Sequence, residues 1–131
     1  MSPPAYLAGF ATEDITPPLF FGERVRLGGY LRMYNYARKV LHALKARAIC
    51  IRHPIDPKNS ILFISCDLVG FQYTKAKIAR KIISHLTGVP IANIIFHFTH
   101  SHTSPEMTGI MPNKVSHKAN TDIQYHVVKP L

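Results

Sequence analysis

The residues best suited to chemistry in this sequence are two histidines, His100 and His102, which stand two positions apart. They follow an apolar run that ends at Phe98, and the segment after them is polar and irregular. Ligands of α/β proteins bind beyond the carboxyl ends of parallel strands, and neutral imidazole is a common zinc ligand. The two histidines therefore either converge on one metal ion, or one binds a metal while the other faces a substrate. Chance proximity is the plainer alternative, because the chain contains eight histidines.

The elements that must position these histidines follow from the hydrophobic pattern. Four runs are typical of strands, namely residues 6–11, 44–52, 60–66 and 92–99. Turn residues at 53–59 predict an antiparallel hairpin between the second and third runs. A helix over 72–87 lies between the third and fourth runs, which predicts a right-handed βαβ unit. The expected fold class is α/β, a mixed β-sheet with a βαβ crossover helix and long loops at the carboxyl edge.

The predicted helix is amphipathic and ends at Gly88 and Pro90. Ile78, Ile82 and Leu86 recur every four residues and form its apolar face. Two further apolar residues, Ala79 and Ile83, stand beside them. Basic residues cover the other side and are expected to be solvated, namely Lys75, Lys77, Arg80 and Lys81.

Two further segments lie outside these elements. Residues 19–36 are rich in glycine and aromatic residues and are expected to form a long ordered loop. The pattern predicts that a further element begins at residues 123–128, so we expect the chain to be cut rather than finished.

Composition predicts one folded domain with a basic surface. The chain has 131 residues, 47% of them hydrophobic, and a formal net charge of +9. This charge favours anionic partners, such as nucleic acid, an acidic membrane surface or an acidic region of the same protein. Lys and Arg are scattered from Arg24 to Lys129, and no nucleic-acid-binding motif is present, so no nucleic acid is expected.

Cysteine usage and the chain start bear on the compartment. Cys50 and Cys66 lie in apolar runs without a CxxC spacing, which predicts two buried thiols in a reducing environment. The start shows no signal peptide, and no run is long enough to cross a bilayer. The expectation is a cytoplasmic protein by default, or a secreted one if the start is incomplete.

The histidine segment can be compared with known His-x-His motifs. Metallo-β-lactamase-like hydrolases carry Asp-His where Ser104 and Pro105 stand here, and amidohydrolase barrels carry the motif on their first strand. Residues 99–105, Thr-His-Ser-His-Thr-Ser-Pro, instead resemble the Thr-His-Thr-His-Ser-Gly-Pro segment of the neutral/alkaline (non-lysosomal) ceramidase family.

Other segments resemble the same family in the same order. Residues 9–18 resemble the family's opening segment, which ends in Asp-Ile-Thr-Pro-Pro, and residues 28–30 resemble its Gly-Tyr loop. Residues 46–48 resemble its Ala-Arg-Ala strand, and residues 65–70 resemble the Asp-Leu segment that ends its next strand. Residues 88–95 resemble the stretch that leads into its histidine motif. Each is weak alone, and together they are fairly specific. The resemblance implies that residues 1–131 are the N-terminal part of a ceramidase-like zinc hydrolase domain.

This resemblance implies a function and a site. The family hydrolyses the amide bond of ceramide to a fatty acid and a sphingoid base, using a water activated by Zn2+. By position, His100 is the expected zinc ligand, and His102 the expected catalytic residue that hydrogen-bonds the substrate or handles a proton. Gly28, Gly29 and Tyr30 are expected to bind the polar head of the substrate.

The sequence also departs from the family pattern. The family's other zinc ligands, a second His, a Glu and a Tyr, come from later in its chain and have no counterpart here. A missing C-terminal region of the same protein is therefore an expected partner, and it would also cover apolar surface left by this chain. The resemblance adds a lipid amide substrate, and the positive charge adds an anionic membrane surface. Ser104 replaces the family's glycine. The alternatives are a small basic module that binds nucleic acid or anionic membranes, and an inactive truncated homologue.

Three charged residues near these motifs are expected to have mainly structural roles. Asp14 is expected to cap local backbone before the Pro-Pro turn, and Arg47 to pair with a carboxylate rather than act in catalysis. Asp67 ends a strand, where it serves either the structure or the orientation of a zinc ligand.

Overall fold

The structure, a computed structural model, describes residues 5–19, 24–30 and 35–110. In chain order its elements are β1 (Leu7–Asp14), β2 (Lys45–Arg52), the 3-10 turn η1 (Pro57–Asn59), β3 (Ile61–Cys66), α1 (Tyr73–Thr87), the 3-10 turn η2 (Ile91–Asn93) and β4 (Ile94–Phe98). The element predicted at residues 123–128 lies outside the described residues.

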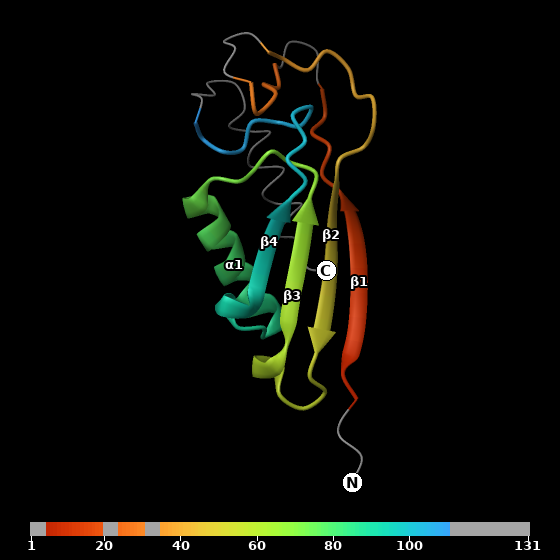
Figure 1. Cartoon of the computed structure of the whole chain (residues 1–131), viewed down its shortest axis with the longest axis vertical. Helices are drawn as coiled ribbons and strands as arrows, with labels where there is room; N and C mark the ends of the chain where they lie inside the picture. The colour runs from red at the N-terminus through yellow and green to blue at the C-terminus, as the bar shows by residue number, and fades with distance from the viewer. Residues whose placement is uncertain (1–4, 20–23, 31–34, 111–131) are drawn as a thin grey trace.

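The four strands form one mixed sheet in the order β1-β2-β3-β4 (Figure 1). β1 and β2 pair antiparallel, β2 and β3 form the predicted antiparallel hairpin, and β3 and β4 pair parallel. Helix α1 connects the two parallel strands, so the predicted βαβ unit and α/β fold class are confirmed. The loops that follow β3 and β4 gather at one end of the sheet, the upper end in Figure 1.

Two strand boundaries differ from the predicted ones by more than one residue. β1 continues three residues past Ala11, because Asp14 still pairs in register with Lys45 of β2. β4 begins at Ile94 rather than residue 92, because residues 91–93 form the turn η2, which the Asn93 amide anchors on the Ser60 carbonyl at 2.9 Å.

One face of the sheet carries the core. Alternate residues of β2, β3 and β4 point to this face and are buried, and they are Ala46, Ala48, Leu62, Ile64, Cys66 and Ile94. Phe96 and Phe98 stack above them with ring centroids 6.2 Å apart. Burial raises the pKa of the Cys66 thiol to about 12, helped by the charge of Asp67, so this thiol stays protonated at neutral pH. Both cysteines are unbridged, and Cys50 is half-buried.

Helix α1 ends as predicted but buries a different stripe. Gly88 adopts the left-handed conformation (φ 73°) and donates its backbone N–H to the Ser84 carbonyl. The buried residues are Ala79 and Ile83, whereas the expected face of Ile78, Ile82 and Leu86 is exposed. The helix is therefore rotated so that Ala79 and Ile83 face inward, and a second apolar stripe stays at the surface.

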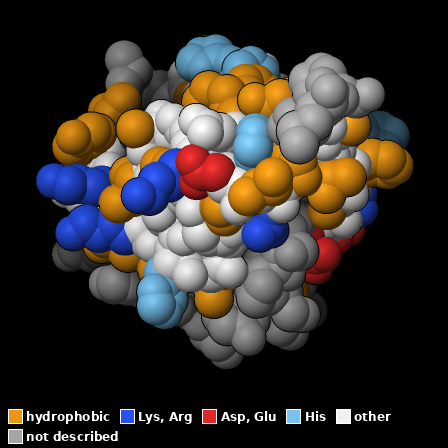
Figure 2. Space-filling view, turned by 90° about the horizontal axis from the view of Figure 1, so that it is seen from below, with side chains coloured by type: hydrophobic (Ala, Val, Ile, Leu, Met, Phe, Trp, Pro, Cys, Tyr) orange, Lys and Arg blue, Asp and Glu red, His pale blue; other side chains and the backbone are white. Residues whose placement is uncertain are grey.

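The opposite face of the sheet is also apolar. Phe10, Ile49, Phe63 and Ile95 stand opposite one another in register across all four strands. All four are exposed, Phe10 at 90% of its surface. Hydrophobic side chains also remain on the surface at the hairpin end of the molecule (Figure 2). Among the described residues no helix is long and apolar enough to span a bilayer.

Candidate functional site

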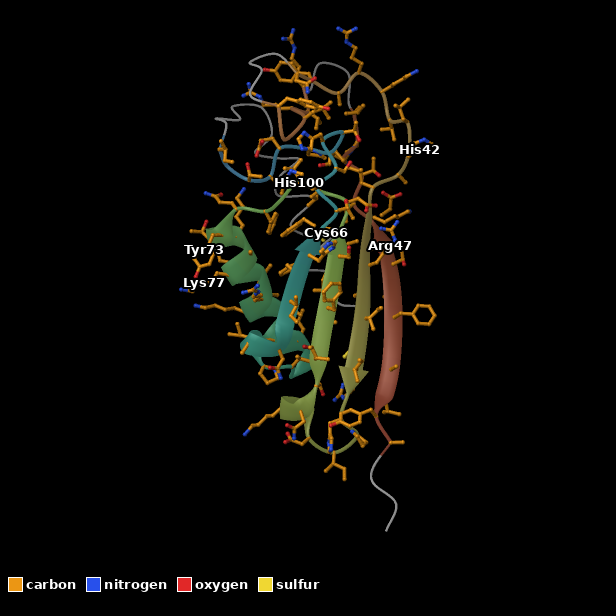
Figure 3. The ribbon with its side chains drawn as sticks, viewed as in Figure 1. His42, Arg47, Cys66, Tyr73, Lys77 and His100 are labelled. Atoms are coloured by element: carbon orange, nitrogen blue, oxygen red, sulfur yellow. The ribbon has the colours of Figure 1, made fainter. Side chains whose placement is uncertain are left out.

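The predicted histidine segment begins where β4 ends, beside the carboxyl end of β3. The Thr99 N–H donates to the Cys66 carbonyl at 3.0 Å, and the His100 N–H donates to the Leu68 carbonyl at 2.9 Å. These bonds continue the parallel pairing beyond the last residues of both strands. His100 is thereby fixed at the edge of the sheet that receives ligands in α/β proteins (Figure 3).

The backbone of His100 departs from the ordinary conformation of a non-glycine residue. Its φ is +61°, in the left-handed region, and such conformations persist where the surrounding structure holds them and often occur at functional sites. Its Nδ1 lies 3.0 Å from the Val69 carbonyl oxygen. A carbonyl only accepts, so Nδ1 is the donor, and in the neutral ring Nε2 then carries the lone pair. This arrangement orients an imidazole for metal binding.

His102 packs between two other predicted site residues. Its ring lies edge-on to the His100 ring, with centroids 4.9 Å apart, and edge-on to the Tyr30 ring, with centroids 5.0 Å apart. Tyr30 comes from the loop before β2, about seventy residues earlier in the chain. The structure therefore brings together residues that the sequence places in two distant segments.

Backbone contacts at Gly28 and Gly29 make this convergence possible. The Gly28 N–H donates to the Ser104 carbonyl at 2.9 Å, and the chain pairs again between Leu27 and Pro105. Gly29 has a φ of +79°, and a Cβ there would lie 2.4 Å from Nδ1 of His102. Only glycine allows the two loops to approach this closely.

Ser104, the departure from the family pattern, has a structural role here. Its side chain is fully buried, and its hydroxyl donates to the Ser101 carbonyl at 2.6 Å and accepts from the Val69 N–H at 3.2 Å. Val69 thus holds the histidine loop twice, through its carbonyl at His100 and through its N–H at Ser104.

Glu106 is a buried carboxylate that holds the turn after the histidine loop, and the sequence analysis did not predict it. It is buried, and its carboxylate accepts from the backbone N–H groups of Thr108 and Gly109, at 2.6 and 3.2 Å, and from the Thr108 hydroxyl. Its own N–H donates to the Arg26 carbonyl at 2.8 Å. No spacing in the sequence distinguishes this glutamate from a surface one.

The three charged residues with expected structural roles lie near the ends of the strands. Nη1 of Arg47 lies 3.1 Å from both carboxylate oxygens of Asp67, and Oδ2 of Asp67 also accepts from the Lys45 N–H. Asp14 accepts from the Thr16 N–H at 2.8 Å and pairs with the Lys45 ammonium at 3.1 Å. The hydrogen bonds to Thr16, followed by the contact with Lys45, lower the Asp14 pKa to about 2. The expected pairing of Arg47 and capping by Asp14 are confirmed.

A cavity of about 540 Å³ adjoins the histidine loop. Its wall includes Thr99, Ser101 and Thr103, which alternate with the two histidines, and the segment from Tyr36 to Leu44. Five of the remaining seven lining residues are apolar, namely Pro17, Leu19, Val25, Leu27 and Pro105, and the other two are Thr16 and Asp67. The histidine loop thus separates the aromatic cluster of Tyr30 from a mainly apolar hollow.

The described residues do not form a complete metal centre. Residues 5–19, 24–30 and 35–110 contain no group of three or more His, Cys, Asp or Glu side chains that could hold a metal ion. Catalytic zinc uses three protein ligands and one open position. The geometry of His100 fits one such ligand, and the other ligands would have to come from elsewhere.

Comparison with known proteins finds likeness in structure rather than in sequence. No family model and no curated protein sequence matches this chain. The structure matches a ceramidase complexed with C2 at a TM-score of 0.70 and 19% identity, over 96% of this chain and 20% of that chain. It also matches a neutral ceramidase from Pseudomonas aeruginosa at a TM-score of 0.66 and 18% identity, over 94% of this chain and 20% of that chain.

This likeness establishes the fold. The chain spans about 20% of the length of the solved ceramidases that it matches, so its sheet and βαβ unit are a fragment of the larger ceramidase fold. The resemblance predicted from short motifs is therefore confirmed as a structural match over nearly the whole chain. Roles for individual residues do not follow from a match of this kind.

Proposed function

We propose that this chain is the N-terminal segment of a zinc-dependent amide hydrolase of the neutral ceramidase type. The substrate class is ceramide or a related N-acyl lipid, and the products are a fatty acid and a sphingoid base. The observation that carries the proposal is the aromatic cluster of Tyr30, His102 and His100 beside Gly29, at the carboxyl ends of β3 and β4. The ceramidase-like fold supports it.

Zinc, when bound, would lower the pKa of a water and polarise the amide carbonyl. His100 would supply one ligand through Nε2, because Val69 holds the proton on Nδ1. The remaining ligands, in this proposal, come from a C-terminal region of the same protein that this sequence does not contain.

The other residues of the cluster would act on the substrate. His102 lies next to His100, with one ring edge against Tyr30, so it can exchange a proton with the amide nitrogen or hydrogen-bond a hydroxyl of the substrate. Gly28 and Gly29 would border the polar head through their backbone, because the space that a Cβ would take at Gly29 is filled by the His102 ring and at Gly28 by Val69. Tyr30 is exposed at the rim, where its hydroxyl can reach a bound ligand.

Zinc binding tests the metal part of this proposal. Zinc would be titrated into the purified chain, and into any longer protein that contains it, with His100→Ala compared with His85→Ala. His85 is an exposed histidine of α1, so its loss controls for the removal of one imidazole. We expect His100→Ala to lose zinc and His85→Ala to keep it. Equal zinc content in both variants of the longer protein would refute the assignment.

Hydrolysis of a fluorogenic N-acyl sphingosine tests the reaction. In a longer protein that binds zinc, we expect His102→Ala to lower kcat by about 10²- to 10⁴-fold, the range for loss of a positioned acid or base, while zinc content stays unchanged. A zinc-loaded protein that cleaves no N-acyl lipid would identify an inactive homologue.

A further inference from the structure

The positive charge of the chain is concentrated in one segment. Residues 24–55 hold eight of the sixteen Lys and Arg residues and none of the seven Asp and Glu residues. This segment therefore carries eight of the nine net positive charges. The basic residues alone look scattered along the sequence, and the asymmetry becomes visible only when the acidic residues are placed as well.

Part of this charge is neutralised in the fold and part is not. Lys45 pairs with Asp14 and Arg47 pairs with Asp67, each at 3.1 Å. Arg38 and Lys39 lie in the loop that leads into β2, and within the described part of the chain neither is paired with a carboxylate. Both are exposed, as is His42 in the same loop.

The tip of this loop, residues 37–43, is also apolar. Val40 and Leu41 follow the basic pair directly and are exposed at 51% and 68% of their surface. The loop lies at the end of the molecule that carries the histidine loop, and His42 stands on the side away from α1 (Figure 3). The same loop forms one wall of the apolar cavity.

We propose that the loop of residues 37–43 docks on an anionic lipid surface. Val40 and Leu41 enter the boundary between headgroups and acyl chains, while Arg38 and Lys39 contact the anionic headgroups. Nucleic acid fits this loop less well, because exposed aliphatic side chains offer no face on which bases can stack. The proposal is independent of the zinc chemistry, since neither histidine takes part in docking.

The absence of tryptophan from the sequence allows a direct test. Leu41→Trp places a single fluorophore at the loop tip, and Ile55→Trp places one at the hairpin turn, where Ile55 is exposed at 81%. With vesicles of phosphatidylcholine and phosphatidylglycerol, we expect a blue shift and quenching by brominated lipid for Leu41→Trp alone. Vesicles of phosphatidylcholine only should give little binding. No shift at position 41, or an equal shift at position 55, would overturn the proposal.

Charge variants test the headgroup contact. In the Leu41→Trp background, removing both Arg38 and Lys39 as alanine should weaken vesicle binding roughly 30-fold, since each basic residue near such a surface contributes about 1 kcal/mol. The matched control removes Lys77 and Lys81 of α1, two exposed basic residues on another element. An equal loss in the control would assign binding to overall charge and contradict docking by the loop. Binding to duplex DNA but not to vesicles would also contradict it.

Discussion

At the scale of single residues, the approach of two loops depends on the missing side chain of Gly29. Its φ is +79°, and an added Cβ would meet the His102 ring. We expect Gly29→Ala to lower the free energy of unfolding by about 1–3 kcal/mol, the range for a strained backbone position. Urea denaturation followed by circular dichroism measures this change.

Gly9 provides the matched control for that substitution. A Cβ at Gly9 in β1 would meet nothing within 4 Å, and its φ is not positive. Gly9→Ala should therefore be neutral or stabilise the chain by up to about 1 kcal/mol, through the entropy of the unfolded state. Equal destabilisation by both variants would show that the contact with His102 does not matter.

Asp14 gives the chain an acid-sensitive contact. Its pKa is lowered from 3.8 to about 2, mainly by hydrogen bonds to Thr16. Because the folded-state pKa is depressed, the stabilisation is complete above about pH 4 and is lost as the pH falls through 2. We expect native chain and Asp14→Asn to differ by at most about 1 kcal/mol at pH 5, since the group is exposed and screened.

The pH dependence of this difference is the informative measurement. Urea midpoints of both proteins, measured from pH 5 to pH 2, should converge as Asp14 is protonated. Glu13→Gln removes the same charge one position away and controls for net charge. A gap between native chain and Asp14→Asn that stays constant across this range would contradict the assigned pKa.

At the scale of elements, helix α1 is held by a narrow stripe. Ile83 is 6% exposed and Ile82 is 42% exposed, although the two are neighbours of the same type. We expect Ile83→Ala to cost about 2–5 kcal/mol, as for buried aliphatic residues. Ile82→Ala should cost less than about 1 kcal/mol, because alanine also favours the helix. Chemical denaturation of both variants provides the comparison, and equal costs would mean that Ile82 is buried in solution.

The sequence predicted the elements better than their orientation. Apolar runs and the stop at Gly88 located the strands and the helix, and the strand-helix-strand order predicted the parallel pairing of β3 and β4. The buried stripe of α1 could not be predicted, because five apolar residues spread over a wide arc of the helix. Burial of Ala79 and Ile83 depends on the fit to the sheet, which periodicity does not specify.

The two histidines of the candidate site could be predicted from the sequence alone, whereas Gly28, Gly29 and Tyr30 were assigned only through the resemblance. His100 and His102 stood out by spacing and by their place after a strand. Their contact with Tyr30 depends on the hydrogen bond between Gly28 and Ser104, a pairing of two irregular loops that leaves no periodic signal. The anchoring of His100 on Val69 depends in the same way on tertiary structure.

At the scale of the whole molecule, the sheet has one covered and one open face. Helix α1 packs at the β4 side of the face that carries the core, whereas the row of Phe10, Ile49, Phe63 and Ile95 on the other face remains exposed. Sheets with two apolar faces are stable when both are covered. The structural match covers only 20% of the solved ceramidases, so in the longer protein proposed above a further layer would cover this face.

This open face predicts how the chain behaves alone. Exposed apolar patches of this kind promote association, so we expect the purified chain to self-associate in sedimentation velocity experiments. Phe10→Lys places a charge on the most exposed member of the row and should increase the monomer fraction. Ile55→Lys adds the same charge at the hairpin turn, off this face, and should leave the distribution unchanged. A native chain that sediments as one monomer and melts cooperatively would contradict this prediction, because the open face would then be stable in contact with water.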